Sequence, residues 1–164
     1  MARALIVGCG CRGRELGAAL LAGGWQVRGT TRRSGALAEI EAAGIEAIVA
    51  DPLQVGTVFD HIEGVGIVYW LMGSAAGEDA DVAAVNGARL ATLLEKLVDT
   101  PVRGLVYEAR GSAAAAALAE GTRVTREATR RWRIPAEIVA ADPGSPGEWR
   151  EAMLAAGERA LLQR

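Results

Sequence analysis

The chain has few of the residues that most often carry proton transfer or bind metals. Among its 164 residues are two cysteines, a single histidine (His61) and a single lysine (Lys96). The cysteines are separated by one residue, a spacing that builds no disulfide framework, and no group of histidines and cysteines has the spacing of a metal site. Catalytic schemes that need several imidazoles or amines are therefore excluded, and we expect no bound metal.

The chain also lacks a strong net charge and a long apolar run. Its formal charge is −2, with no basic block at either end, so nothing indicates binding to nucleic acid. No apolar run reaches the roughly 18–20 residues of a membrane span, and the first residues do not have the pattern of a signal peptide. We expect a cytoplasmic protein without a membrane partner, folded as a single domain over residues 1–164.

Short apolar runs alternate with segments of helical length along the whole chain. Strands are expected at residues 4–7, 25–30, 45–50, 65–71, 102–108 and 134–140. Helices are expected at 14–22, 35–43, from 51 onward, 78–99, 112–119, 122–132 and 148–162. This alternation predicts the α/β class: a doubly wound parallel sheet (Rossmann) of about six strands in the order 3-2-1-4-5-6, with helices on both faces.

Several residues are expected to mark the ends of these helices. Ser34 and Ser112 are suited to N-cap positions, because a hydroxyl oxygen accepts a hydrogen bond from a free helical N–H. Gly44 is suited to a helix C-terminus, and Pro101 is expected to end the long helix before it.

A glycine-rich turn, Gly-Cys-Gly-Cys-Arg-Gly at 8–13, follows the first apolar run and opens a helix. In a dinucleotide-binding fold, Gly8 would allow the tight turn and Gly10 would let the backbone approach a pyrophosphate. Gly13 would let the helix pack closely on the strand. Cys11 and Arg12 complete the loop, and Arg12 either reaches a phosphate oxygen or points into water. The turn predicts a phosphate-binding site at a helix N-terminus.

The end of the second strand indicates which dinucleotide is bound. NAD-binding folds have an acidic residue there for the ribose 2′-hydroxyl, whereas arginine is suited to the 2′-phosphate of NADP. The chain instead has Thr30, Thr31, Arg32 and Arg33, with no acid until Glu39. Guanidinium groups bind phosphate through paired hydrogen bonds, and the threonines would add hydroxyl donors. We therefore expect NADP(H) in preference to NAD(H), although the arginines also suit a solvated loop.

Further positions fit a bound dinucleotide. Asp51 either accepts a hydrogen bond from the adenine amino group or caps the helix that follows it. Leu71, Met72 and Gly73 follow the fourth strand, where the backbone would pass the middle of the cofactor. Trp70 is either a core residue or part of a nicotinamide pocket.

Several of these segments resemble atypical short-chain dehydrogenases/reductases of the nucleotide-sugar-epimerase-like, NAD(P)-binding group. The resemblance is carried by Ile6–Gly10, Arg14–Leu16, Gly29–Arg32, Asp51, Asn86-Gly87 and Gly104–Tyr107. It implies a Rossmann fold with a shortened C-terminal part, and oxidoreductase activity on a small carbonyl or nucleotide-linked substrate.

The chain departs from that family beyond Tyr107. Active members carry a Tyr-x-x-x-Lys pair on the helix after the fifth strand, but here no tyrosine follows Tyr107 and no lysine follows Lys96. Tyr107 is then either catalytic or part of the core. Three hypotheses stay open: an NADP-dependent oxidoreductase without the usual pair, a non-catalytic dinucleotide sensor, and a reductase completed by a second copy in a homodimer.

Overall fold

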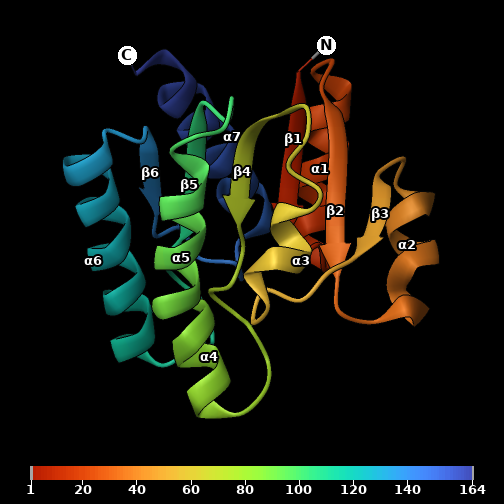
Figure 1. Cartoon of the computed structure of the whole chain (residues 1–164). Helices are drawn as coiled ribbons and strands as arrows, with labels where there is room; N and C mark the ends of the chain where they lie inside the picture. Colours follow the sequence, from red (N-terminus) through yellow and green to blue (C-terminus); the bar gives the residue numbers. More distant parts are fainter. Residues whose placement is uncertain (1, 164) are drawn as a thin grey trace.

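The computed structural model describes residues 2–163 and contains one parallel sheet (Figure 1). Its strand order is β3-β2-β1-β4-β5-β6, and every neighbouring pair is parallel, which confirms the predicted class and order. The strands are β1 (Arg3–Val7), β2 (Gln26–Thr31), β3 (Glu46–Val49), β4 (Val65–Trp70), β5 (Gly104–Glu108) and β6 (Ala136–Val139).

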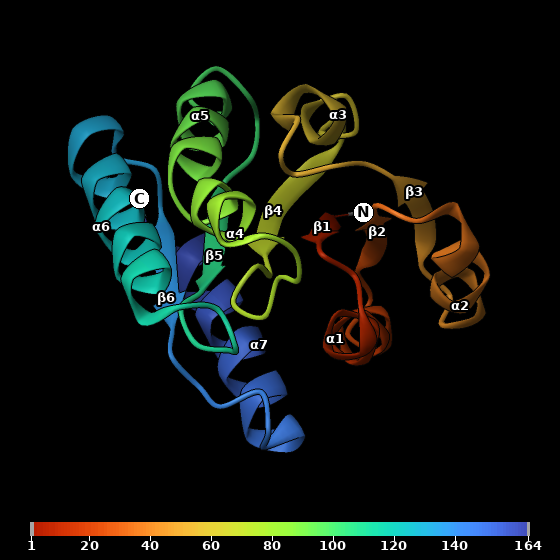
Figure 2. The same cartoon turned by 90° about the horizontal axis from the view of Figure 1, so that it is seen from below.

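Helices cover both faces of this sheet (Figure 2). They are α1 (Cys11–Ala22), η1 (Ser34–Ala36, a 3-10 helix), α2 (Leu37–Ala42), α3 (Val55–Phe59), α4 (Asp79–Val85), α5 (Ala88–Leu97), α6 (Ala115–Trp132) and α7 (Pro146–Leu162). Within residues 2–163, none of them has the length and apolar character that a bilayer crossing requires.

The core has two halves because side chains of a strand alternate between faces. In β1, Ala4 and Ile6 pack with residues of α1, α2 and α7, whereas Leu5 and Val7 pack with residues of α3, α4, α5 and α6. All four side chains are fully buried. The central strands therefore have continuous apolar runs, as expected for parallel strands covered on both sides.

The helix expected over residues 78–99 is instead two helices, α4 and α5, which separate at Asn86 and Gly87. The side-chain amide of Asn86 donates hydrogen bonds to the carbonyl oxygens of Val82 (3.0 Å) and Met72 (3.1 Å). A Cβ at Gly87 would lie 2.9 Å from the carbonyl oxygen of Ala83, so glycine permits the close approach at the break. The apolar spacing continues across the break, which explains why a single helix was predicted.

Two of the four predicted helix-end markers, Ser34 and Ser112, were wrong, whereas α5 ends at Leu97, before Pro101. Gly44 does end its helix, with a φ of 84°. Ser34 begins η1, and no side chain caps that helix. Ser112 lies before α6, which runs unbroken where two helices were expected, and its backbone N–H donates to Ser74 Oγ at 3.2 Å. The position of Ser112 is therefore set by contact with the loop that contains Ser74, and not by capping of a helix.

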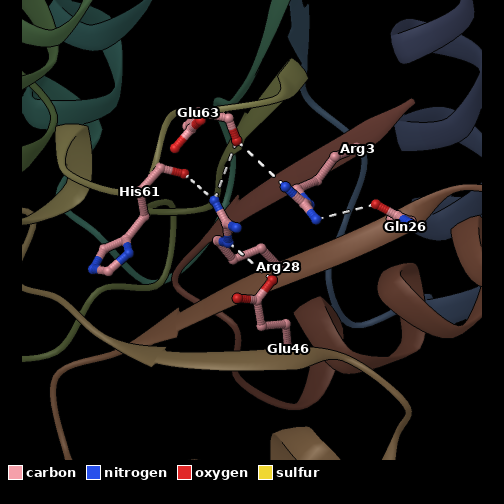
Figure 3. Close-up of polar contacts among 6 residues, drawn as sticks. All are labelled: Arg3, Gln26, Arg28, Glu46, His61 and Glu63. Carbon is pink, nitrogen blue, oxygen red and sulfur yellow. Dashed lines mark hydrogen bonds and ion pairs between the residues drawn. The ribbon is translucent and has the colours of Figure 1, made fainter. Parts of the chain in front are cut away.

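Arg28 organises a polar cluster at the amino edge of the sheet (Figure 3). Its guanidinium donates to Glu46 Oε2 at 3.1 Å and to the carbonyl oxygens of His61 and Glu63, and its side chain is only 12% exposed. Arg3 donates to the same Glu63 carbonyl oxygen. The cluster therefore fastens the segment between α3 and β4 to the neighbouring strands.

We expect Arg28→Met to lower the free energy of unfolding by about 2 kcal/mol, because it keeps the apolar stem but leaves the part-buried carbonyl oxygen of His61 without this donor. Urea unfolding followed by circular dichroism measures this change. Arg159→Met is the matched control: it removes an ion pair to Glu137 from a side chain that is 57% exposed, and should cost less than about 1 kcal/mol. Equal midpoints for the two variants would contradict the stabilising role of Arg28.

Candidate functional site

A cleft of about 740 Å³ opens at the carboxyl edge of the sheet. It lies where β1 and β4 are adjacent and the strand order reverses, the position at which doubly wound folds bind ligands. Its wall includes nearly every residue that we expected to bind a cofactor: Gly8, Gly10, Cys11, Arg12, Gly13, Thr30, Thr31, Arg32, Arg33, Asp51, Leu71 and Met72.

The three glycines of the loop differ in what a Cβ atom would meet. Gly8 has a φ of 88°, and a Cβ there would lie 2.7 Å from the carbonyl oxygen of Leu71. A Cβ at Gly13 would lie 3.3 Å from Ile6 Cγ2, which shows how closely α1 packs on β1. A Cβ at Gly10 would have no atom of the described residues within 4 Å apart from its two chain neighbours, although this residue lines the cleft. Gly10 therefore leaves the cleft open rather than relieving a contact within the fold.

The N-terminus of α1 adds a favourable field to this opening. Gly10 is its N-cap, no side chain of the described residues caps the helix, and its first turn has no acidic residue. Its first backbone N–H groups and the positive end of the helix dipole therefore remain for an anionic ligand.

Thr30 holds the glycine loop in place. It is buried at the end of β2, its Oγ1 accepts a hydrogen bond from Gly8 N–H (3.2 Å), and its carbonyl oxygen accepts one from Cys9 N–H (2.8 Å). Cys9 also lines the cleft, but it is only 4% exposed and packs in the core, and burial raises the pKa of its thiol to about 12. Cys9 is therefore an unreactive packing residue, while Cys11 at the cleft wall is exposed.

Arg12 lines the cleft, and its guanidinium contacts other residues of the fold. Its Nε donates to the carbonyl oxygen of Pro143 at 2.8 Å, and it pairs with Glu15 at 2.9 Å. It therefore links α1 to the loop before α7 and helps to form one side of the cleft.

The end of β2 places two arginines at the opposite side. Thr31 Oγ1 accepts a hydrogen bond from Arg33 N–H at 3.2 Å, which shapes the turn after the strand. Arg32 extends to the β4–α4 loop and donates to the carbonyl oxygen of Ala76 at 3.2 Å. Both arginines are exposed at the cleft wall. Their positive charge therefore lies at the cleft wall beside the end of β2.

Asp51 and Gly73 differ from expectation. Asp51 lines the cleft, but its Oδ1 accepts a hydrogen bond from Leu53 N–H (2.9 Å) and caps a turn, since α3 begins only at Val55.

Gly73 is not part of the cleft wall. A Cβ there would lie 2.8 Å from Glu108 Oε1, so glycine is needed for the β4–α4 loop to pack against β5.

Glu108 is a cleft residue that the sequence reasoning did not identify. It is the last residue of β5 and is only 4% exposed. Its Oε1 accepts a hydrogen bond from Gly73 N–H and its Oε2 one from Trp149 Nε1–H, each at 2.9 Å. Burial raises the pKa of the carboxyl, and the two hydrogen bonds oppose that shift. A charged residue ending an apolar strand at the ligand-binding edge was the signal that could have found it.

The other candidate residues lie in the core or far from the cleft. Tyr107 is fully buried and donates to Asn86 Oδ1 at 2.7 Å, and burial raises its pKa. Trp70 is also fully buried, donates to the carbonyl oxygen of Val85 at 2.9 Å and does not line the cleft. His61 lies at the amino edge of the sheet (Figure 3). The structure therefore places Tyr107 and Trp70 in the core.

No protein-family model and no curated protein matches the chain. Solved structures with the same fold include UDP-glucuronic acid 4-epimerase from Bacillus cereus in complex with NAD, at 17% identity and a TM-score of 0.65. Another is a short-chain dehydrogenase/reductase superfamily protein from Agrobacterium tumefaciens with bound NAD, at 22% identity and a TM-score of 0.69. A third is UDP-glucose 4-epimerase from Thermotoga maritima with UDP-glucose, at 14% identity and a TM-score of 0.70.

These similarities define a doubly wound fold shared with NAD-dependent epimerases and short-chain dehydrogenases/reductases. Each alignment covers 83% of this chain but only 55%, 48% and 54% of the respective structures. The chain therefore spans about half the length of the proteins it matches. The predicted resemblance is confirmed at the level of the fold.

Proposed function

We propose that this chain binds a nicotinamide dinucleotide in the cleft at the carboxyl edge of its sheet. The observation that carries the proposal is the glycine loop, where Gly10 leaves free space in front of the uncapped N-terminus of α1. Two of the similar structures contain NAD, which supports the same class of ligand. The cleft also reaches both halves of the sheet, as a dinucleotide requires.

We further propose a preference for NADP(H). Arg32 and Arg33 would bind the 2′-phosphate, and Arg32 would exchange its single hydrogen bond to the Ala76 carbonyl oxygen for stronger ones to an anion. The nearest acidic residue along the chain, Glu39, lies 3.4 Å from Arg14, which offsets its charge. A 2′-phosphate therefore meets little repulsion at this end of the cleft.

Binding without hydride transfer is the second part of the proposal. The buried Tyr107, hydrogen-bonded to Asn86, favours a sensor or regulatory module over an oxidoreductase of the usual kind. General acid catalysis needs a proton donor within reach of the substrate, and a tyrosine in the core does not provide one. Oxidoreductase activity on a small carbonyl or nucleotide-linked substrate remains the alternative that the fold suggests.

Titration with NADPH and NADH by calorimetry tests the ligand and its preference. We expect tighter binding of NADPH, and a loss of about tenfold in NADPH affinity in Arg32→Ala with little change for NADH, because one charge-assisted contact is removed. Arg126→Ala is the matched control, since this exposed arginine on α6 is outside the cleft. Equal affinities for NADPH and NADH in the unmodified protein would contradict the NADP preference, and no binding of either would contradict the site.

A further inference from the structure

We propose that Glu108 makes the cleft sensitive to the oxidation state of its ligand, so that the carboxylate favours the oxidised dinucleotide over the reduced one. This inference rests on the proposed function, because it assigns a specificity-determining residue to the same cleft. Its basis is the position of Glu108, the isolation of its charge and the charge difference between the two ligand forms.

The position follows from the topology. In a doubly wound sheet each half binds one nucleotide, and the arginines after β2 mark the half built by β1, β2 and β3 as the adenosine side. Glu108 ends β5, so it lies at the wall of the other half, where the nicotinamide ring would bind. Gly73 and Trp149 hold one carboxylate oxygen each, which fixes the orientation of the group.

The charge of Glu108 has no cationic partner among the described residues. The arginines on the surrounding segments are engaged elsewhere: Arg110 pairs with Asp142 at 3.6 Å, and Arg12 pairs with Glu15. Asp81 on α4, which also lines the cleft, is negative and exposed. The fold therefore buries a carboxylate without a compensating positive charge, an arrangement that is costly unless a ligand supplies one.

The two forms of the ligand differ in that charge. The nicotinamide ring carries a positive charge when oxidised and none when reduced, whereas the phosphates and the adenosine are the same in both. Burial raises the pKa of Glu108, and the two hydrogen bonds that it accepts oppose this shift by stabilising the ionised form. A cationic ring beside it would restore neutrality in the buried wall, so the interaction favours only the oxidised form.

A purely structural role for Glu108 makes a different prediction. If the carboxylate only joined the β4–α4 loop to α7, removing its charge would weaken the binding of both ligand forms equally. The informative quantity is therefore the ratio of the NADP⁺ and NADPH affinities, in which effects on loop position and on phosphate binding cancel.

Calorimetric titration of both forms against Glu108→Gln tests the inference. Glutamine has the same shape without the charge, and we expect the NADP⁺-to-NADPH affinity ratio to fall by about tenfold or more. Glu95→Gln is the matched control, because it makes the same change at an exposed residue of α5 outside the cleft wall, and the ratio should not change.

A second measurement needs no substitution. Lowering the pH protonates Glu108, so the affinity ratio of the unmodified protein should fall through the pKa of that carboxyl, whereas Glu108→Gln should show no such step. A ratio that is unchanged in Glu108→Gln, or independent of pH in the unmodified protein, would overturn the role of Glu108 while leaving the proposed function intact. Failure of both ligand forms to bind the unmodified protein would overturn the two together.

Discussion

Gly10→Val should abolish dinucleotide binding, with a loss of affinity of at least about 100-fold. The added side chain would project into the open space that Gly10 leaves at the cleft wall, where a pyrophosphate would approach the N-terminus of α1. The backbone there is extended, with a φ of −82°, which valine adopts without strain. Calorimetric titration with NADPH measures the loss, and thermal unfolding should show little change.

Substitutions at two other glycines are the controls, because they distinguish a loss of binding from a loss of stability. Gly56→Val adds the same side chain to α3. A Cβ there would likewise meet no atom of the described residues within 4 Å, apart from its chain neighbours and its own helix. Gly56 lies outside the cleft, so binding should be retained. Gly8→Ala should lower stability, because Gly8 has a positive φ and lies against Leu71. Full NADPH binding by Gly10→Val would show that phosphate does not approach the loop.

The fold could be predicted because its main determinants are local. Alternating apolar runs and helical segments, together with right-handed crossovers, were sufficient for the strand order. The helix break at Asn86 could not be predicted, because it depends on a hydrogen bond to Met72, a residue from another segment. The start of α3 was misplaced for a related reason: Asp51 caps a turn of its own.

The residues of the candidate site likewise divide into those that could be predicted from local sequence and those that depend on distant contacts. Glycine spacing located the cleft, since a φ of 88° at Gly8 and the space beside Gly10 depend on the absence of a side chain. The sequence could not show where long side chains go, so the contact of Arg12 with the loop before α7 was missed. Glu108 was missed because the two groups that hold its carboxylate, Gly73 N–H and the indole of Trp149, lie 35 and 41 positions away along the chain.

Asn86→Leu should lower the free energy of unfolding by about 3 kcal/mol. Asn86 is fully buried; its amide donates to the carbonyl oxygens of Val82 and Met72, and its Oδ1 accepts from the Tyr107 hydroxyl. Leucine has a similar size but no polar atoms, so the two carbonyl oxygens and the Tyr107 hydroxyl lose their hydrogen bonds to Asn86. Each buried polar group left without a partner lowers the stability of the fold. Chemical denaturation measures the loss, and weaker NADPH binding should accompany it because Met72 lines the cleft.

Tyr107→Phe measures how much the Tyr107 hydroxyl contributes to the hydrogen bonds made by Asn86. Removing the hydroxyl alone leaves one acceptor of Asn86 unused, so we expect a cost of about 1 kcal/mol. In the Tyr107→Phe background, Asn86→Leu should cost less than it does alone, because no buried hydroxyl is then left unpaired. Strictly additive losses would show that the hydroxyl contributes nothing to the network. Asn86 would then act through its contacts with Met72 and Val82 alone, and the break between α4 and α5 would be independent of β5.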